Sequence, residues 1–176
     1  MRLLLLALGC TVMSVRLSAQ HVEIGVASAL AHPLGAAHRV DAHLVPVLGL
    51  APSRGWGVAA ALNWFRTTHE TDSLTVRPIM AGVGYTFPAA RVLVTPSLVA
   101  GPAWTTVERG ADSGHAVTLA VRAGLSASVP LVARISGTAS AGYLWNGRTI
   151  WRPAGGLAPP PLDAVVASVG LVLRVF

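Results

Sequence analysis

Apolar residues recur at every second position along most of the chain after Gln20, and clusters of Pro, Gly, Asp, Ser and Asn interrupt them. This alternation predicts β-strands with two different faces, because successive side chains of a strand point to opposite sides. Eight such segments are expected, at residues 21–30, 39–50, 56–67, 74–87, 91–107, 116–129, 132–146 and 162–176. The pattern therefore predicts an all-β protein.

The connections between these segments alternate between short and long. The short ones are residues 51–55, 88–90 and 130–131, and the longer ones are residues 31–38, 68–73, 108–115 and 147–161. An even number of strands with tight turns at one end and longer loops at the other is typical of a bacterial outer-membrane barrel. The expected fold is an eight-stranded antiparallel up-and-down transmembrane β-barrel that comprises residues 20–176.

One face of each segment is apolar along its length, as the lipid-facing side of such a barrel requires. The outward set of residues 116–129 is Val117, Leu119, Val121, Ala123, Leu125 and Ala127, and its inward set includes Thr118, Arg122, Gly124, Ser126 and Ser128. In residues 162–176 the inward set includes Ser168, Gly170 and Arg174. Glycines fall mostly on the inward parity, which relieves crowding in a barrel whose interior is only wide enough for side chains.

Aromatic residues gather at the two ends of the predicted strands, as in the girdles at the two membrane interfaces. The expected girdle residues are Trp56, Tyr85 and Phe87 at the short-turn end, and Trp64, Trp104, Tyr143 and Trp145 at the long-loop end. Trp56 and Trp64 are eight residues apart. That separation is about 27 Å along a strand and roughly 20 Å along a tilted barrel, slightly under the apolar band of about 25 Å.

The N-terminus has the pattern of a secretory signal peptide over residues 1–19, with an apolar run and small residues before Gln20. Cleavage after Ala19 would remove Cys10, the only cysteine, and with it any thiol or disulfide chemistry. An alternative is a lipoprotein signal in which Cys10 is lipidated.

Composition supports one folded domain and excludes several classes of function. The chain has 176 residues, 53% of them apolar and only 11% charged, which argues against disorder. The net charge of +6 comes wholly from arginine, and no basic run or aromatic-basic stripe accompanies it. Nucleic-acid binding is therefore not expected.

Charged residues on the inward parity predict a hydrogen-bonded and ion-paired network in the lumen. Its expected members are Glu23 and Arg134 near the short-turn end, Arg122 at mid-depth, and Asp41 and His43 near the long-loop end. Charges confined in this way must pair, because unpaired burial costs several kcal/mol. The network would plug a narrow lumen, and exchange of its pairs would alternatively gate an ion path. A wide pore is excluded, since it needs about sixteen strands.

The layout and the last strand resemble the small eight-stranded outer-membrane barrels of Gram-negative bacteria, the group that includes the OmpA transmembrane domain and OmpX. Residues 169–176 alternate apolar residues and end in Phe176, as does the assembly signal of that family. The resemblance implies a monomer in the outer membrane that uses this strand to engage the barrel assembly machinery. Four prolines, Pro46, Pro78, Pro96 and Pro102, interrupt strand hydrogen bonding, and bulges are expected at Pro78 and Pro96.

The predicted partners are outer-membrane lipid and lipopolysaccharide, whose phosphates suit Arg109, Arg148 and Arg152. No catalytic residue, metal or cofactor is predicted. Some barrels of the resembled class modify lipid A, and Asp112 with Ser113 and His115 would be the residues of such a rim-site enzyme. A further alternative is an exported soluble or lipid-anchored β-barrel that binds a ligand.

Overall fold

The computed structural model describes residues 20–34, 39–40, 43–62, 64–69, 72–154, 157–160 and 162–175. The predicted signal peptide, residues 1–19, lies outside these ranges, as do Asp41 and Phe176. The described strands are β1 (Gln20–Pro33), β2 (Arg39–Val40), β3 (His43–Pro52), β4 (Gly55–Leu62), β5 (Phe65–His69), β6 (Asp72–Ala89), β7 (Val92–Arg109), β8 (Asp112–Val132), β9 (Ile135–Trp151) and β10 (Leu162–Val175).

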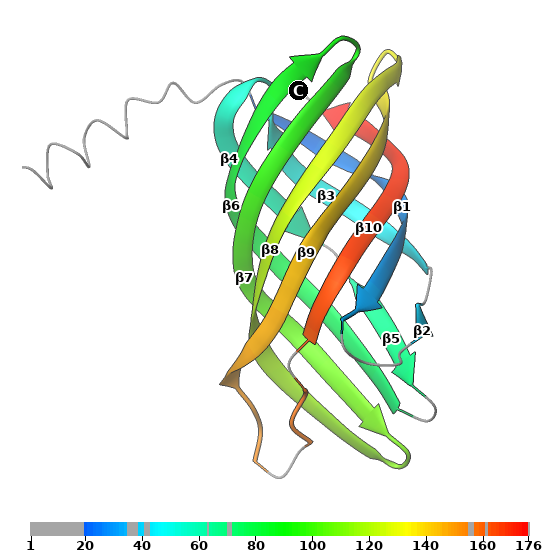
Figure 1. Ribbon diagram of the computed structural model, residues 1–176, viewed down its shortest axis with the longest axis vertical. Coiled ribbons are helices and arrows are strands. Elements are labelled where there is room, and N and C mark those ends of the chain that lie inside the picture. The colour runs from blue at the N-terminus through cyan, green and yellow to red at the C-terminus, as the bar shows by residue number, and fades with distance from the viewer. Residues whose placement is uncertain are drawn as a thin grey trace, which may run out of the picture.

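The strands form one antiparallel sheet that closes into a ring (Figure 1). β1 pairs with both β3 and β10, and β6 pairs with β7. If β2 with β3, and β4 with β5, are each counted as one strand position, every neighbour in the ring except the closing pair β1–β10 is also a neighbour along the chain. β4 and β5 pair with the same strand, β6, and β2 extends the position of β3 beside β5. The ring therefore has eight strand positions, and the predicted eight-stranded up-and-down barrel is confirmed.

The two ends of the barrel differ. The connections β3–β4, β6–β7 and β8–β9 lie at the short-turn end, where β1 begins and β10 ends. At the opposite, long-loop end the β5–β6 and β7–β8 hairpins extend beyond the ring (Figure 1). Cross-strand pairing continues in these hairpins as far as His69 with Asp72 and Arg109 with Asp112.

One of the predicted long loops is therefore a hairpin with a two-residue turn. β7 ends at Arg109 and β8 begins at Asp112, so the prediction of a loop over residues 108–115 is wrong. The alternation of apolar residues stops in this region, but the ladder of backbone hydrogen bonds does not need apolar side chains to continue. Gly110, with a φ of 58°, provides the left-handed conformation that so tight a turn requires.

The short turn between the sixth and seventh predicted strands lies later than expected. The prediction placed it at residues 130–131, whereas the structure has it at Ala133 and Arg134. Pro130 lies instead at an irregularity of the β8–β9 pairing, between Pro130 and Val132. Proline cannot donate to the ladder, so it marks a local distortion here and not the end of the strand.

The bulges expected at Pro78 and Pro96 are absent from the described β6–β7 pairing. The register is the same before and after each proline, since Pro78 pairs with Ala103, Ala81 with Ala100 and Phe87 with Val94. Individual pairs are missing near both prolines instead. Each proline lacks a backbone N–H, and the strands accommodate this by an interruption of the hydrogen-bond ladder, without an inserted residue.

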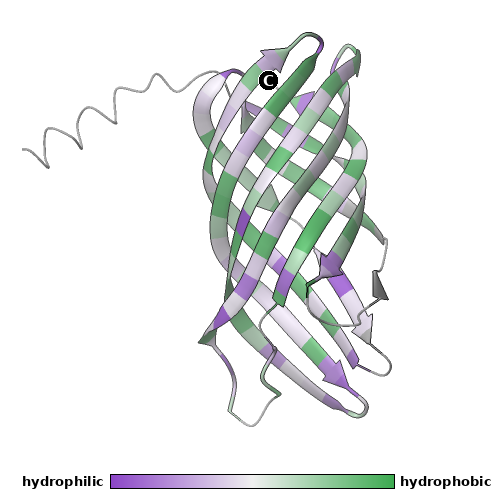
Figure 2. Ribbon diagram, viewed as in Figure 1, coloured by the Kyte–Doolittle hydropathy of each residue, from purple (hydrophilic) through white to green (hydrophobic). Residues whose placement is uncertain are grey.

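Side-chain exposure alternates along the strands as the parity predicted. In β10, Val165, Val169 and Leu171 are exposed on the outer face, whereas Ala164 and Val172 are buried on the inner face. Hydrophobic colours run along the strands, and the most hydrophilic residues gather toward the ends of the barrel (Figure 2). Among the described residues, none belongs to a helix long and apolar enough to span a bilayer.

Candidate functional site

A cluster of polar side chains fills the lumen at the short-turn end. The inward parity of β1 carries His21 and Glu23, and Glu23 lies opposite Arg174 of β10. Glu23 Oε1 lies 3.0 Å from His21 Nε2 and 3.4 Å from Arg174 Nε. Arg174 Nη2 donates to Ser128 Oγ, and His21 Nδ1 contacts Ser53 Oγ at 3.2 Å. Side chains from three strands and one turn thus join a network around a single carboxylate.

Arg122 of β8 occupies the lumen at mid-depth. Its Nη2 donates to Ser140 Oγ at 3.0 Å, and Ser140 Oγ lies 2.8 Å from Ser168 Oγ. Arg122 Nε is buried without a hydrogen-bond partner, and the described residues place no carboxylate within 4.0 Å of the guanidinium. Beside it is a narrow cavity of about 120 Å³ whose polar lining includes Glu23, Ser97 and Ser126.

A third, uncharged layer lies further toward the long-loop end. Thr105, Thr118 and Asn146 are each almost fully buried. Thr118 Oγ1 hydrogen-bonds Asn146 Oδ1, Thr105 Oγ1 lies 3.0 Å from Thr118 Oγ1, and Asn146 Nδ2 donates to Thr105 at 3.4 Å. The lumen is therefore crossed at three depths by hydrogen-bonded side chains.

The structure separates the residues predicted to form one lumen network. Glu23 and Arg122 point into the lumen but belong to different layers. Arg134 does not belong to the lumen, because it lies in the β8–β9 turn with its side chain exposed. Asp41 lies outside the described residues, and only the backbone of His43, opposite Ala29, is described.

Sequence reasoning missed two members of this cluster, His21 and Arg174. The strand parity placed Arg174 inward, but a choice between Arg134 and Arg174 as partner of Glu23 requires the register between the first and last strands. His21 has the same parity as Glu23, two residues earlier, and this signal was present in the sequence.

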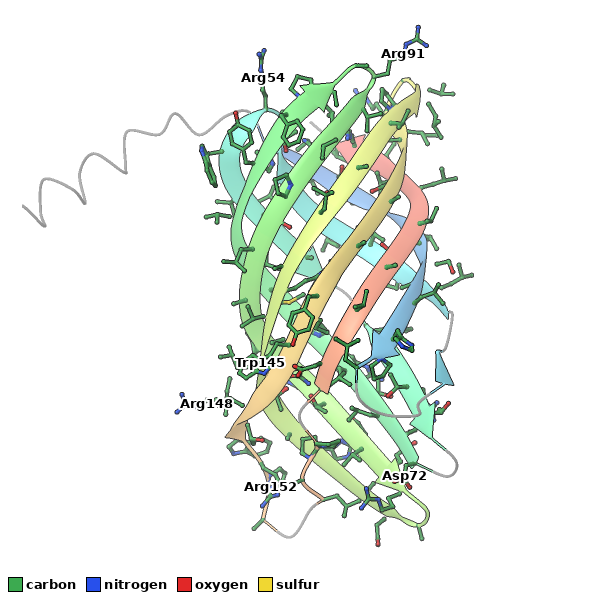
Figure 3. All side chains as sticks on the ribbon, in the orientation of Figure 1. Arg54, Asp72, Arg91, Trp145, Arg148 and Arg152 are labelled. Carbon is green, nitrogen blue, oxygen red and sulfur yellow. The ribbon has the colours of Figure 1, made fainter. Side chains whose placement is uncertain are left out.

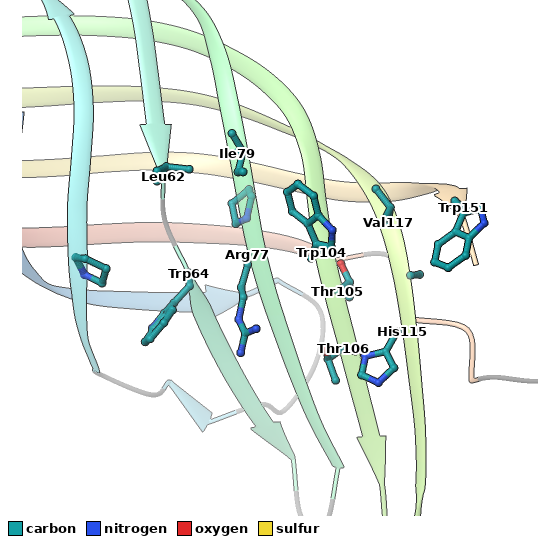
Figure 4. Close-up of a pocket in the computed structure, with 13 residues that line it drawn as sticks. Leu62, Trp64, Arg77, Ile79, Trp104, Thr105, Thr106, His115, Val117 and Trp151 are labelled. Atoms are coloured by element: carbon teal, nitrogen blue, oxygen red, sulfur yellow. Dashed lines mark hydrogen bonds between the residues drawn. The ribbon is translucent and has the colours of Figure 1, made fainter. Parts of the chain in front are cut away.

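The outer surface carries a row of large side chains that crosses five strand positions at one level. Arg77 of β6 pairs with Trp104 of β7, Trp104 pairs with Val117 of β8, and Val117 pairs with Trp151 of β9. Trp64 completes the row, because it precedes Phe65, the partner of Val76. These side chains line a groove of about 490 Å³ on the outside of the barrel, which we call the Arg77 groove (Figure 4).

The Arg77 groove is polar on one side and apolar on the other. Toward the long-loop end it is lined by Thr106 and His115, whose Oγ1 and Nδ1 atoms lie 3.2 Å apart. Toward the short-turn end it is lined by Leu62 and Ile79, which pair with each other across β4 and β6. Arg77 is exposed between them, with Cζ 5.8 Å from the centre of the Trp64 ring.

The other predicted girdle residues also face outward. At the short-turn end Trp56 packs edge-on against Tyr85 at 5.3 Å between ring centres, and Tyr85 lies 6.4 Å from Phe87. Trp104 and Tyr143 are exposed toward the long-loop end, and Trp145 is half-buried. The aromatic residues thus form two groups separated along the strands.

The residues of the catalytic alternative do not form a connected triad in the described structure. Asp112 pairs across the strands with Arg109, Ser113 pairs with Glu108, and the contact of His115 is with Thr106. Within the described ranges no group of three or more His, Cys, Asp or Glu side chains is arranged to hold a metal ion.

Comparison with known proteins places the fold among outer-membrane barrels. No family model and no curated protein matches the chain. Among solved structures, a major outer-membrane protein of Thermus thermophilus aligns with a TM-score of 0.61 and 12% identity, over 89% of this chain and all of that one. Neisserial surface protein A gives 0.60 and 13%, and the attachment invasion locus protein Ail of Yersinia pestis gives 0.55 and 15%, each over 89% of this chain and 97% of the other.

Proposed function

We propose that the chain, which has the fold of the small eight-stranded outer-membrane barrels, is an integral outer-membrane protein of a Gram-negative-type bacterium. Its role is structural or lies in interactions at the cell surface, and its lumen is plugged. The observation that carries this proposal is the outer face of the barrel, which is apolar over a continuous band between the two aromatic groups.

The outer band is built from side chains that would be costly to expose to water. Its exposed residues include Ile24, Val26, Leu48, Val58, Val83, Leu98, Leu125, Val169 and Leu171. Each exposed apolar side chain of this size favours transfer to hydrocarbon by about 1.5–3 kcal/mol. A soluble barrel keeps a polar outer face on most strands, so this surface fits lipid and not water.

Charged residues lie at the edges of this band. Arg54 and Arg91 point away from the barrel at the short-turn end, and Asp72 and Arg152 lie at the opposite end (Figure 3). The distribution matches a bilayer, in which charge is tolerated at the two interfaces and expensive between them.

The interior supports a plugged barrel and not a diffusion pore. Hydrogen-bonded side chains cross the lumen at three depths, around Glu23, Arg122 and Asn146. An eight-stranded barrel has an interior just wide enough for such side chains to fill. The protein has no catalytic role in this proposal. It is a monomer, and the barrel assembly machinery inserts it through its C-terminal strand.

Fractionation of a tagged full-length chain expressed in a Gram-negative host tests the proposal. We expect the protein in the outer-membrane fraction, with a different gel mobility before and after boiling, because a folded barrel resists detergent until heated. A mature chain expressed without residues 1–19 is the matched control and should stay out of the envelope. Release of the full-length protein with the periplasmic contents would contradict the proposal.

A further inference from the structure

The Arg77 groove lies at the edge of the apolar band nearest the long-loop end. Along β6, Arg77 is eight residues from Tyr85 of the short-turn aromatic group, which corresponds to about 27 Å along the strand. Trp64 stands in the same relation to Trp56. Arg77 is therefore neither in the middle of the hydrocarbon nor out in water, but at the depth of the headgroups of the outer leaflet.

Arg77 has no acidic partner at this depth. The described residues put no carboxylate within 4.0 Å of it, whereas the neighbouring arginines of the hairpins are paired, Arg66 with Glu108 at 3.4 Å and Arg109 with Asp72 at 2.8 Å. A guanidinium on a lipid-facing surface needs an anion or water to remain charged. Its planar set of donors matches a phosphate in particular, through two parallel hydrogen bonds.

We propose that the Arg77 groove binds the phosphorylated headgroup of an outer-leaflet glycolipid, with Arg77 on a phosphate and Ile79 and Val117 against the acyl chains. The inference rests on the proposed outer-membrane function. The arrangement of the groove selects an amphipathic ligand, because its apolar side continues into the lipid-facing band and its polar side, with Thr106 and His115, faces the headgroups (Figure 4). Trp64 and Trp104 supply flat walls on either side of the guanidinium.

The site differs from the one that the sequence predicted for lipopolysaccharide. Of the three predicted arginines, Arg109 in the β7–β8 hairpin is engaged by Asp72 at the start of β6, whereas Arg148 and Arg152 are exposed and do not line the groove. The sequence alone does not indicate Arg77 as a binding residue, because an arginine on the apolar face of a strand is only an exception to the alternating pattern. Its meaning depends on the alignment of β5, β6 and β7, which places it between two tryptophans.

The test uses the folded mature barrel in neutral detergent micelles, with purified lipid A that carries two phosphates as the probe. Native mass spectrometry counts bound lipid and gives its affinity. We expect Arg77→Gln to weaken binding by about tenfold, the loss of one charge-assisted contact, and Arg77→Lys to weaken it less. Arg91→Gln makes the same change of charge at the short-turn end and should bind like the wild type.

Two other probes distinguish the source of the phosphate. Dephosphorylated lipid A should bind the wild type as weakly as lipid A binds the Arg77→Gln variant. Inorganic phosphate should not displace lipid A at equal concentration, because it makes no apolar contact. Displacement by inorganic phosphate, equal binding by Arg77→Gln, or equal loss in Arg91→Gln would each overturn the assignment.

The assay separates this inference from the proposed function. Each variant is first required to show the boiling-dependent mobility shift of the wild type, and Arg77→Lys keeps the test valid if Arg77→Gln does not fold. A barrel that fractionates with the outer membrane and binds lipid A independently of Arg77 would refute the groove alone. A periplasmic protein that binds lipid A through Arg77 would refute the location alone.

Discussion

At the scale of single residues, the lumen shows how much the strand parity determines and where it stops. Parity alone placed Glu23, Arg122 and Arg174 on the inward side, and the structure has all three there. It also placed Arg134 inward, because the turn was expected three residues too early. Parity depends only on neighbouring positions within one strand. The partner of Glu23 depends instead on the register of the closing pair β1–β10, which joins the two ends of the barrel sequence.

This difference between Arg174 and Arg134 can be tested by paired substitutions. Glu23→Gln and Arg174→Gln each leave one charge of a largely buried pair without its partner, and each should lower the free energy of unfolding by about 2–3 kcal/mol. Arg134→Gln, in the exposed turn, should change it by less than about 0.5 kcal/mol. Urea unfolding of the barrel in lipid vesicles gives the three values. An Arg134→Gln effect as large as that of Arg174→Gln would show that Arg134 is the partner.

Two inward glycines of β6 provide a second test at this scale. A Cβ at Gly82 would overlap the backbone carbonyl of Leu98, whereas a Cβ at Gly84 would meet its nearest atoms at 3.4 Å. Because backbone of a neighbouring strand cannot move aside, Gly82→Ala should cost about 1–3 kcal/mol of stability or block folding. Gly84→Ala should be nearly neutral. Boiling-dependent mobility and urea midpoints compare the variants, and equal tolerance would contradict the close approach of β6 and β7 at Gly82.

At the scale of the elements, the sequence predicts the number and order of the strands better than their ends. Alternation is strong where one face of a strand is apolar, so it predicts all eight strand positions. It fades toward the tips of the long-loop hairpins, where polar residues are paired across the strands, Ser73 with Glu108 and Arg109 with Asp112.

The turns allow a prediction about these elements. Ala90 in the β6–β7 turn has a φ of 57°, a left-handed conformation that costs a residue with a Cβ about 1–2 kcal/mol. Ala90→Gly should therefore leave stability unchanged or raise it by up to about 1 kcal/mol, after the entropy cost of glycine. Ala111→Gly is the matched control, since Gly110 already supplies the positive φ of that turn. It should lower stability by several tenths of a kcal/mol, and urea midpoints that rank the two variants the other way would contradict this account.

At the scale of the whole molecule, the inner and outer faces of one sheet serve opposite environments. The outer face is apolar and interrupted by charge only at its edges, while the inner face combines buried apolar side chains, such as Met80 and Leu144, with serine, threonine and a few ionised groups. The sequence could predict this division because it depends only on parity. It could not predict the Arg77 groove, because that surface combines residues from six strand positions whose relative alignment is set by barrel closure.

The division leads to a prediction about permeability. The cavity beside Arg122 is about 120 Å³, well below the roughly 300–1,000 Å³ that binds a drug-sized molecule, and the layers of Glu23 and of Asn146 lie above and below it. Vesicles that contain the folded barrel should therefore not swell in isotonic glucose or sucrose, in contrast to vesicles with a wide porin. Arg122→Ala enlarges only the cavity at mid-depth. The vesicles should remain equally impermeable to the sugars, because the two remaining layers of side chains still close the lumen. Sugar entry through the wild type would contradict the plugged barrel, and entry only through Arg122→Ala would mean that this arginine alone closes the path.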